Sequence, residues 1–397
     1  MPTLELHPIE PVARDGWIER SARVEAPDGR TQTLWFRAPE AQAANLSGLS
    51  DAFLIAVLFH AMRNGWAIRV RGLVSASLLR NLHEFQTAWN RWKPDRYRTA
   101  EIEAGALVPE TGARNCRAMT AFSGGLDSCF AVWRQVRMAS PATRHALDAG
   151  LMVNGLDISP PDAQSEVFAA AAEKSRRILA SVGLPLMTVA TNLRILPHDW
   201  LDTHGSAVAA CLHAMGAAHG TGLIPGTHAY EALRIPFGSN PLTDPMLSSD
   251  RMGIVYDSAG FSRVEKARAV SDWPEALRDM RVCWEGEHMD RNCGACGKCV
   301  AFAICFAVNE LPIPPCMPIR NLAESIRKIR HDPLPPYGII RMKERLALAK
   351  QRGIRAPWVA AAKDWMRRSE RFHQSKRPSP RRLSLRAIAA WASRLRR

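Results

Sequence analysis

A short segment rich in glycine and serine constrains this chain of 397 residues more than any other feature. It follows the apolar run 119–122, precedes an apolar helical pattern, and reads Ser123-Gly124-Gly125-Leu126-Asp127-Ser128. Two adjacent glycines let the backbone turn sharply and approach a ligand without Cβ contacts. Backbone N–H groups at such a turn, together with those of the opening helix, form a site for anions. The segment therefore predicts a phosphate-binding loop, in which Ser123 and Ser128 add hydroxyl donors and Asp127 orients the loop or holds Mg²⁺.

The pattern around this loop predicts an α/β fold. From residue 117 on, short apolar strands alternate with helical patterns, which indicates a doubly wound parallel sheet with helices on both faces. Residues 1–112 are expected to form a small accessory α+β domain, with a hairpin through Asp28-Gly29 and a helix capped by Ser77. Residues 113–318 form the predicted loop-bearing domain, and residues 319–397 form a helical basic tail.

The net charge of +15 is concentrated near the C-terminus. Residues 341–397 hold 18 Lys and Arg against 3 Asp and Glu, whereas the first 340 residues hold 35 of each sign. Arginines surround an apolar stripe in this tail; the stripe is Leu385, Ile388, Trp391 and Leu395, and the arginines are Arg381, Arg382, Arg386, Arg394, Arg396 and Arg397. Such a basic amphipathic helix can touch an anionic membrane surface or nucleic acid, and the alternative is a solvated tail.

Four of the nine cysteines are closely spaced as C-x9-C-x2-C-x2-C: Cys283, Cys293, Cys296 and Cys299. Four thiolates in short hooks suit tetrahedral Zn²⁺, and because no ligand position stays open, the zinc is expected to be structural. Cysteinates also bind [4Fe–4S] clusters, so iron–sulfur is the competing interpretation, and free thiols are the third. The chain shows neither a secretory signal nor a run of about 18 apolar residues, so these thiols predict a cytoplasmic protein.

The loop resembles the Ser-Gly-Gly-x-Asp-Ser loop of the PP-loop ATP pyrophosphatases, a superfamily with an adenine nucleotide alpha hydrolase-like (HUP-type) fold. It lacks the lysine that follows glycine in the P-loop of kinases and GTPases. The resemblance implies that residues 123–128 bind the pyrophosphate part of ATP, and that ATP is cleaved to AMP and pyrophosphate with Mg²⁺. It also implies catalytic roles for Ser123, Asp127, Ser128 and Lys266, and ATP contacts at the strand ends Val153-Asn154 and Gly226.

A PP-loop followed by a four-cysteine knuckle is similar to the 7-cyano-7-deazaguanine synthase family over residues 117–310. Those enzymes activate a carboxylate with ATP and use ammonia to make an amide and then a nitrile. Where that family carries a Tyr-Pro-Asp-Cys-Arg signature, this chain reads Asn240-Pro241-Leu242-Thr243-Asp244. The departure indicates a divergent member with its own acceptor, for which His228 and Asp244 are candidate substrate contacts.

Three functions are compatible with these features. The favoured one is an ATP-dependent ligase that adenylates a small molecule, after which ammonia or another nucleophile attacks; solution or a partner would supply the ammonia. The alternative is a tRNA-modifying PP-loop enzyme that transfers sulfur and holds RNA with the basic tail. A nucleotide-binding scaffold without turnover is the third, and the intact loop argues against it. The sequence leaves the oligomeric state open.

Overall fold

The computed structural model describes residues 1–375 apart from 111, 113, 160, 161, 163, 164, 198, 284–287 and 330. The chain divides into two compact units, each described here by itself. The larger unit consists of residues 1–293 and 305–318, and the smaller one consists of residues 294–304 and those from 319 onward. The apolar stripe and arginines predicted for residues 381–397 lie outside the described residues.

Ten strands of the described residues form one sheet. In chain order they are β1 (Thr3–Arg14), β2 (Trp17–Glu25), β3 (Thr31–Pro39), β4 (Ala67–Ser75), β5 (Ile102–Val108), β6 (Arg117–Ala121), β7 (Ala146–Asn154), β8 (Leu186–Thr191), β9 (Thr221–Pro225) and β10 (Gly253–Asp257). Their order across the sheet is β10-β9-β6-β7-β8-β3-β2-β1-β4-β5.

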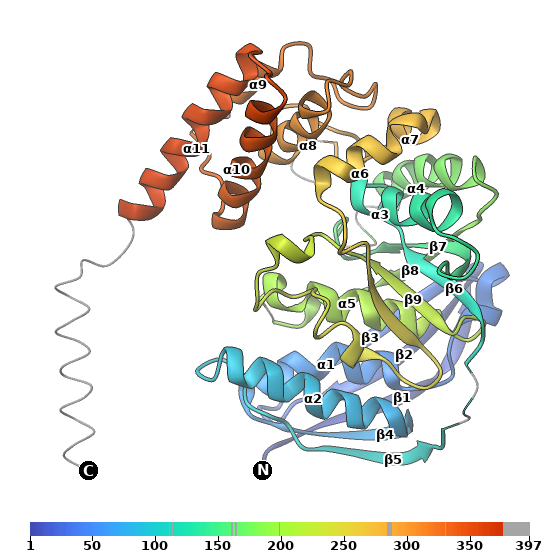
Figure 1. Ribbon diagram of the computed structural model, residues 1–397. Coiled ribbons are helices and arrows are strands. Elements are labelled where there is room, and N and C mark those ends of the chain that lie inside the picture. Colours follow the sequence, from blue (N-terminus) through green and yellow to red (C-terminus); the bar gives the residue numbers. More distant parts are fainter. Residues whose placement is uncertain are drawn as a thin grey trace, which may run out of the picture. The chain divides into compact units, whose positions relative to one another are not determined.

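Strands β10, β9, β6, β7 and β8 are parallel neighbours, which confirms the predicted α/β fold with a mostly parallel sheet. Of these five strands, β6 comes first in the chain. Strands β7 and β8 lie on one side of it in the sheet, and β9 and β10 lie on the other (Figure 1). The strand order therefore reverses between β6 and β9. In open α/β sheets, ligands bind beyond the carboxyl ends of the strands at such a reversal.

Residues 1–112 continue this same sheet. Strands β1, β2 and β3 form an antiparallel meander, and β3 pairs with β8, while β4 and β5 run parallel beside β1. The expected β2–β3 hairpin turns at Gly29, whose φ of 86° is a conformation that glycine adopts without strain. The domain boundaries predicted at 112 and 318 stay predictions. Strands β1, β5 and β10 lie outside the elements expected from the sequence.

Helices cover both faces of the parallel strands (Figure 1). The α-helices of the described residues, in chain order, are α1 (Asp51–Asn64), α2 (Ala76–Trp92), α3 (Leu126–Trp133), α4 (Ser165–Ala180), α5 (Trp200–Ala214), α6 (Arg263–Ala269), α7 (Pro274–Asp279), α8 (Gly297–Val308), α9 (Leu322–Lys328), α10 (Pro336–Gln351) and α11 (Pro357–Ser375). Short turns of other helix types are η1 (Glu40–Asn45), η2 (Arg134–Met138), η3 (Leu193–Ile195), η4 (Tyr230–Ala232), η5 (Pro245–Leu247) and η6 (Val270–Asp272). No described helix is both long and apolar enough to cross a membrane.

One continuous apolar core joins α1, α2 and α5 to one face of the sheet. Helix α1 is apolar along most of its circumference, and its side chains Phe53, Leu54 and Leu58 are almost completely buried. Gly65 ends this helix in the left-handed region with a φ of 67°, as the sequence pair Asn64-Gly65 predicts. Because this core holds residues from both halves of the larger unit, the N-terminal strands are anchored to the loop-bearing strands.

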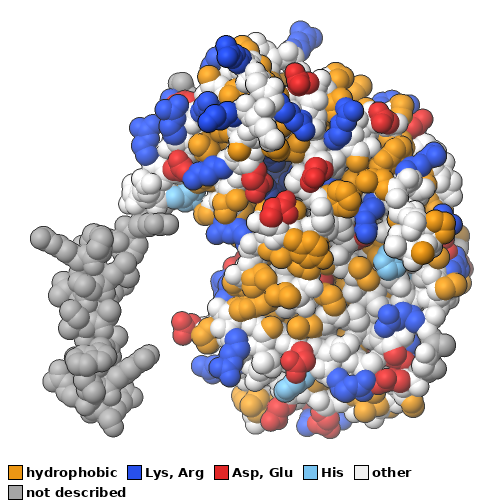
Figure 2. Space-filling view, viewed as in Figure 1, with side chains coloured by type: hydrophobic (Ala, Val, Ile, Leu, Met, Phe, Trp, Pro, Cys, Tyr) orange, Lys and Arg blue, Asp and Glu red, His pale blue; other side chains and the backbone are white. Residues whose placement is uncertain are grey.

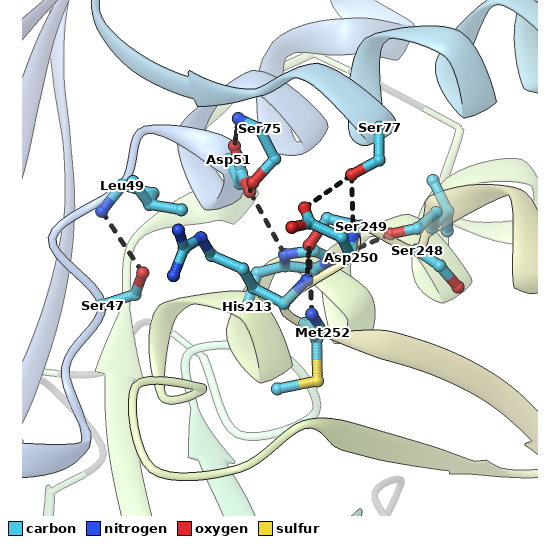
Figure 3. Close-up of polar contacts among 12 residues, drawn as sticks. Ser47, Leu49, Asp51, Ser75, Ser77, His213, Ser248, Ser249, Asp250 and Met252 are labelled. Atoms are coloured by element: carbon cyan, nitrogen blue, oxygen red, sulfur yellow. Dashed lines mark hydrogen bonds and ion pairs between the residues drawn. The ribbon is translucent and has the colours of Figure 1, made fainter. Parts of the chain in front are cut away.

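Ser77 does not cap α2, so that prediction is wrong. The N-cap is Ser75, whose N and Oγ donate to the carboxylate of Asp51 at 2.9 and 2.6 Å. Ser77 instead exchanges two hydrogen bonds of 2.7 Å with Asp250, which lies 173 residues away (Figure 3). His213 of α5 joins this polar cluster, with Nδ1 4.0 Å from Asp51. The Ser77 hydroxyl, which the local sequence pattern assigns to capping the helix, therefore bonds Asp250 from a distant part of the chain instead.

Candidate functional site

The loop that follows β6 has the backbone geometry that its glycines predict. Gly124 adopts a φ of 72°, which favours glycine, and a Cβ there would lie 2.9 Å from the Ser175 hydroxyl of α4. Gly125 is extended, and its Cβ would lie 3.3 Å from the carbonyl oxygen of Arg281. Helix α4 and the segment at Arg281 thus pack closely against the two glycines of the loop. Helix α3 begins at the next residue, Leu126, so the loop enters a helix N-terminus at the carboxyl edge of the sheet.

The two loop serines bond within the loop. The Ser123 hydroxyl lies 3.4 Å from the Ser128 hydroxyl and 3.4 Å from the backbone nitrogen of Gly125. The Ser128 hydroxyl donates to the carbonyl of Gly125 at 3.0 Å. Ser123 is exposed, whereas Ser128 is buried. These contacts hold the turn closed and leave the Ser123 side chain accessible from solvent.

Two cations converge on Asp127 in the first turn of α3. Arg263 pairs with Oδ2 of this carboxylate, and Lys266 Nζ lies 3.1 Å from Oδ1. Lys266 is fully buried, and its ammonium also donates to the carbonyl oxygen of Gly226 at the end of β9. The ammonium lies 5.8 Å from the centre of the Phe130 ring. This cluster therefore connects β6 to β9 at the point where the strand order reverses.

Burial and charge oppose each other in this cluster. Burial raises the pKa of Asp127, but the neighbouring charges of Arg263 and Lys266 outweigh burial and hold the pKa well below its usual range. Burial lowers the pKa of Lys266, and the charge of Asp127 opposes this shift. The carboxylate is therefore ionised at neutral pH, and of its two cations Lys266 is fully buried whereas Arg263 is partly exposed to solvent.

A capping box places both cations. The Ser262 hydroxyl accepts from the Glu265 backbone at 3.3 Å, and the Glu265 carboxylate accepts from the Ser262 backbone at 2.7 Å. This box begins α6, so that Arg263 and Lys266, three residues apart, share one helix face. The sequence singled out Lys266 and missed Arg263. The signal that could have found Arg263 is the pattern Ser-Arg-x-Glu-Lys at residues 262–266.

The other predicted ATP contacts lie at the same edge of the sheet. Val153 and Asn154 end β7, and Asn154 is buried. Gly226 directly follows β9, and its backbone nitrogen donates to the carbonyl of Asp257 at 2.8 Å. A Cβ at Gly226 would lie 2.6 Å from that same carbonyl oxygen. The structure thus places these residues near the ends of adjacent parallel strands, although their role in binding ATP stays a prediction.

Asp257 is a further buried carboxylate at this edge that the sequence did not reveal. It ends β10, pairs with Arg134, and accepts a hydrogen bond of 3.1 Å from Gln135. The following residue, Ser258, has a φ of 72°, a conformation in which residues other than glycine are uncommon. Backbone strain of this kind concentrates near functional sites. The end of β10 therefore belongs to the same set of strand ends as the loop.

His228 and Asp244, the predicted substrate contacts, are both buried. The backbone nitrogen of His228 donates to the Tyr256 hydroxyl at 2.9 Å, and the His228 ring packs edge-on against Phe237. The carboxylate of Asp244 accepts a hydrogen bond of 2.6 Å from the Ser239 hydroxyl and one of 3.0 Å from the backbone nitrogen of Asn240. Its described contacts lie within its own loop and do not reach residues 123–128. Their role as substrate contacts stays a prediction.

The four predicted metal ligands come together. The sulfur atoms of Cys283, Cys293, Cys296 and Cys299 all lie within 4.8 Å of one another. Tetrahedral zinc with Zn–S distances of about 2.3 Å needs sulfur atoms about 3.8 Å apart, which this cluster satisfies with small adjustments. Gly294 makes the tight turn between two of the ligands with a φ of 69°. The cluster could therefore hold a metal ion, and its donor set is consistent with structural zinc.

The segment that leads to the first of these cysteines packs against the loop of residues 123–128. The backbone nitrogen of Arg281 donates to the carbonyl of Gly124 at 2.8 Å. The Arg281 guanidinium is buried and donates to the carbonyls of Cys283 and Met289 at 3.3 and 3.1 Å. The Asn292 side chain accepts from the backbone nitrogen of Cys283 at 3.2 Å. Hydrogen bonds thus run from the loop glycine to the cysteine-bearing turn.

Comparison of the chain with known proteins finds no matching family model, no matching curated protein and no matching solved structure. Fold and site define an α/β protein with a glycine- and serine-rich loop at a strand-order reversal and a four-cysteine cluster that could hold a metal ion.

Proposed function

We propose that this chain is an ATP-dependent adenylating enzyme of the PP-loop type, with a HUP-type nucleotide-binding core. One observation carries the proposal. The Ser-Gly-Gly-Leu-Asp-Ser loop lies at a helix N-terminus beside the strand-order reversal, and Arg263 and Lys266 converge on its Asp127. Backbone N–H groups, a helix N-terminus, the buried ammonium of Lys266 and the partly exposed guanidinium of Arg263 together suit a polyphosphate.

The loop residues would bind the pyrophosphate part of ATP and stabilise its departure. Loop N–H groups and the Ser123 hydroxyl would donate to phosphate oxygens. Phosphate oxygens would also compete with Asp127 for Arg263 and Lys266, which frees the carboxylate to take up Mg²⁺, an ion that prefers oxygen ligands. When bound, Mg²⁺ supplies further neutralisation of the charge that develops on the leaving pyrophosphate. Exchange of these ion pairs would couple nucleotide binding to assembly of the site.

The proposed reaction forms a C–N bond in two steps. First, a carboxylate oxygen of a small acceptor attacks the α-phosphorus of ATP, and the bond from that phosphorus to the pyrophosphate oxygen breaks. Ammonia or another nucleophile then attacks the activated carbonyl carbon, the bond to AMP breaks, and a proton leaves the new amide nitrogen. Positioning and preorganised charge, rather than covalent catalysis by the protein, would account for most of the rate.

We propose that the four-cysteine cluster holds structural zinc in a reducing, cytoplasmic setting, because the thiols must stay reduced to act as ligands. Four thiolates around one ion leave no position open for substrate. Metal content measured by mass spectrometry on the purified chain tests this. One zinc per chain is expected, and a Cys299→Ser variant should lose it. A brown protein with iron and sulfide would instead show an iron–sulfur cluster.

The decisive experiment measures AMP and pyrophosphate released from Mg·ATP with ammonium across a panel of small carboxylates, deazapurines and acidic sugars. Release of AMP that depends on one acceptor class would support adenylation and name the class. Release of ADP would overturn the proposal. If no small molecule stimulates AMP release but tRNA does, the result would favour a sulfur-transferring tRNA enzyme.

A matched pair of variants separates the site from general effects on folding. Asp127→Asn removes the carboxylate at the loop, whereas Asp148→Asn removes a carboxylate of β7 that pairs with Arg117 and His219. Asp127→Asn should abolish AMP release, while the Asp148 control should retain it. Equal activity of both variants would reject the assignment of the loop.

A further inference from the structure

Helices α10 and α11 of the smaller unit enclose an open groove. The groove has a volume of about 350 Å³, and it is lined by Lys343, Leu346, Ala347, Lys350, Lys363, Met366 and Arg367. On α10 the positions 343, 347 and 350 recur at helical spacing, and on α11 the positions 363 and 367 do the same. Lys343 near the start of α10 pairs with Glu370 near the end of α11 at 2.7 Å, and Lys350 and Lys363, at the opposite ends of these helices, line the same groove. The two helices therefore run antiparallel. The groove thus lies along a helical hairpin.

Positive charge lines both walls of this groove without matching negative charge. Of its four cations, Lys343 is the one with an ion pair among the described residues, and it pairs with Glu370. Lys350, Lys363 and Arg367 are exposed and meet no carboxylate in the described part of the chain. Lys and Arg side chains also gather over these helices in Figure 2. Since the first 340 residues carry equal numbers of both charges, this excess is local to the smaller unit.

The floor of the groove distinguishes between classes of anionic partner. Leu346, Ala347 and Met366 form it, and none of the lining residues is aromatic. Proteins that bind single-stranded nucleic acid stack bases on aromatic side chains, and phosphates gain nothing from an aliphatic floor. A membrane-binding helix projects large apolar residues such as Trp toward the lipid, but Trp358 and Trp365 of α11 are buried, and within the groove Leu346 is buried while the small Ala347 and the flexible Met366 reach solvent. An aliphatic floor between two cationic walls suits neither ligand well.

We propose that this groove binds an acidic amphipathic helix of a partner protein. Aliphatic side chains of that helix would enter between α10 and α11 and contact Ala347 and Met366, because adaptable methionines are well suited to helix-in-groove contacts. Its Glu and Asp side chains would face the cations at positions 350, 363 and 367. Charge complementarity of this kind increases the association rate and selects the partner. The surface is independent of the phosphate-binding loop and does not require that ATP be the substrate.

The test uses the full chain and a synthetic peptide of about 18 residues, which is five helical turns. The peptide carries leucine at every third or fourth position, with glutamate on both flanks. Fluorescence anisotropy at about 0.15 M ionic strength measures its binding. A second peptide of the same charge, with serine in place of leucine, reports charge alone. A single-stranded RNA and vesicles with anionic phospholipid are the competing probes.

Charge-reversal variants locate the binding surface. Lys350→Glu combined with Lys363→Glu should weaken binding of the leucine peptide at least tenfold. Arg144→Glu combined with Arg320→Glu changes the net charge equally at exposed positions outside the groove and should change the affinity less than twofold. Met366→Gln should also weaken binding of the leucine peptide while leaving the serine peptide unaffected. Circular dichroism checks that every variant is folded.

Three outcomes would overturn the proposal. Equal binding of the leucine and serine peptides would show that the groove floor plays no part. Equal losses in the groove variant and its control would show that overall charge, not this surface, holds the peptide. RNA or anionic vesicles that bind at lower concentration than the peptide, and lose affinity in the groove variant alone, would assign the surface to nucleic acid or lipid.

Discussion

Two aspartates follow the neighbouring parallel strands β6 and β9, yet their surroundings differ completely. Asp127 lies in the first turn of α3 and is slightly exposed, whereas Asp244 lies in the loop after β9 and is fully buried. Asp127 meets two cations, Arg263 and Lys266, which hold its pKa far below the usual range. Asp244 meets only neutral donors, and burial raises its pKa to about 7. The first carboxylate is therefore ionised at neutral pH, whereas the second holds its proton up to near neutrality.

This contrast shows how a carboxylate becomes part of a binding site. Desolvation acts on both residues in the same direction, so the sign of the net shift depends on whether cations come from elsewhere in the fold. For Asp127 they come from α6, which is 136 and 139 residues away in the sequence. For Asp244 the partners lie within five residues, as expected of a group that shapes its own loop. The difference identifies Asp127 as the better candidate for chemistry.

The largest expected effect comes from Asp127→Asn. The change leaves Lys266 buried without its carboxylate, and breaking a buried ion pair in this way costs about 3 kcal/mol of unfolding free energy. Urea unfolding at pH 7.5 measures this loss, and AMP release should fall below detection in the same variant. Asp148→Asn is the control and should cost less, about 1 kcal/mol, since Arg117 is exposed and the asparagine amide oxygen can still accept a hydrogen bond from the buried His219. Unchanged stability in Asp127→Asn would remove the distinction between the two aspartates.

Lys266→Met should separate function from stability. Removing one partner of a buried ion pair is usually destabilising. Here, however, Arg263 would still pair with Asp127, and the substitution removes an ammonium whose charge is disfavoured by burial. The unfolding free energy should change by less than about 1 kcal/mol. AMP release should nevertheless fall at least tenfold, because a phosphate contact is lost. A variant as active as the parent chain would show that Lys266 only neutralises Asp127.

Asp244→Asn should have the opposite effect on stability. Burial raises the pKa of folded Asp244 to about 7, whereas the carboxyl of the unfolded residue loses its proton near pH 3.8. Between these values the folded state binds more protons, so stability falls as pH rises through this window. The variant lacks this titration and should be more stable than the parent by at least about 1 kcal/mol at pH 8. Urea unfolding between pH 4 and pH 8 follows the difference, which should vanish near pH 4.

Ser239→Ala is expected to have the smallest effect. It removes one neutral hydrogen bond to Asp244 and costs about 1 kcal/mol. Since the Ser239 hydroxyl lowers the pKa of Asp244, its loss should raise that pKa further. The decline in stability should therefore begin near pH 3.8 as in the parent chain but continue to a higher pH in this variant. A downward shift would mean that the hydroxyl stabilises the protonated carboxyl instead.

Local signals in the sequence predicted several elements correctly. The Asp28-Gly29 hairpin, the end of α1 at Gly65 and the turn at Gly124 all depend on glycine in the left-handed region, a steric preference of the residue itself. The close spacing of the cysteines likewise predicted the cluster that the structure brings within 4.8 Å. These predictions succeeded because each one concerns residues that lie close together in the chain.

By itself, the sequence determined the loop, its strand-to-helix setting and the four-cysteine cluster, because backbone sterics and ligand spacing act over a few residues. Tertiary structure decided that Ser77 bonds Asp250 rather than capping its helix, and that Arg263 joins Lys266 at Asp127. It also decided that Asp244 turns inward. Those outcomes depend on strand order and desolvation, which bring distant groups into contact and change the free energy of each charge.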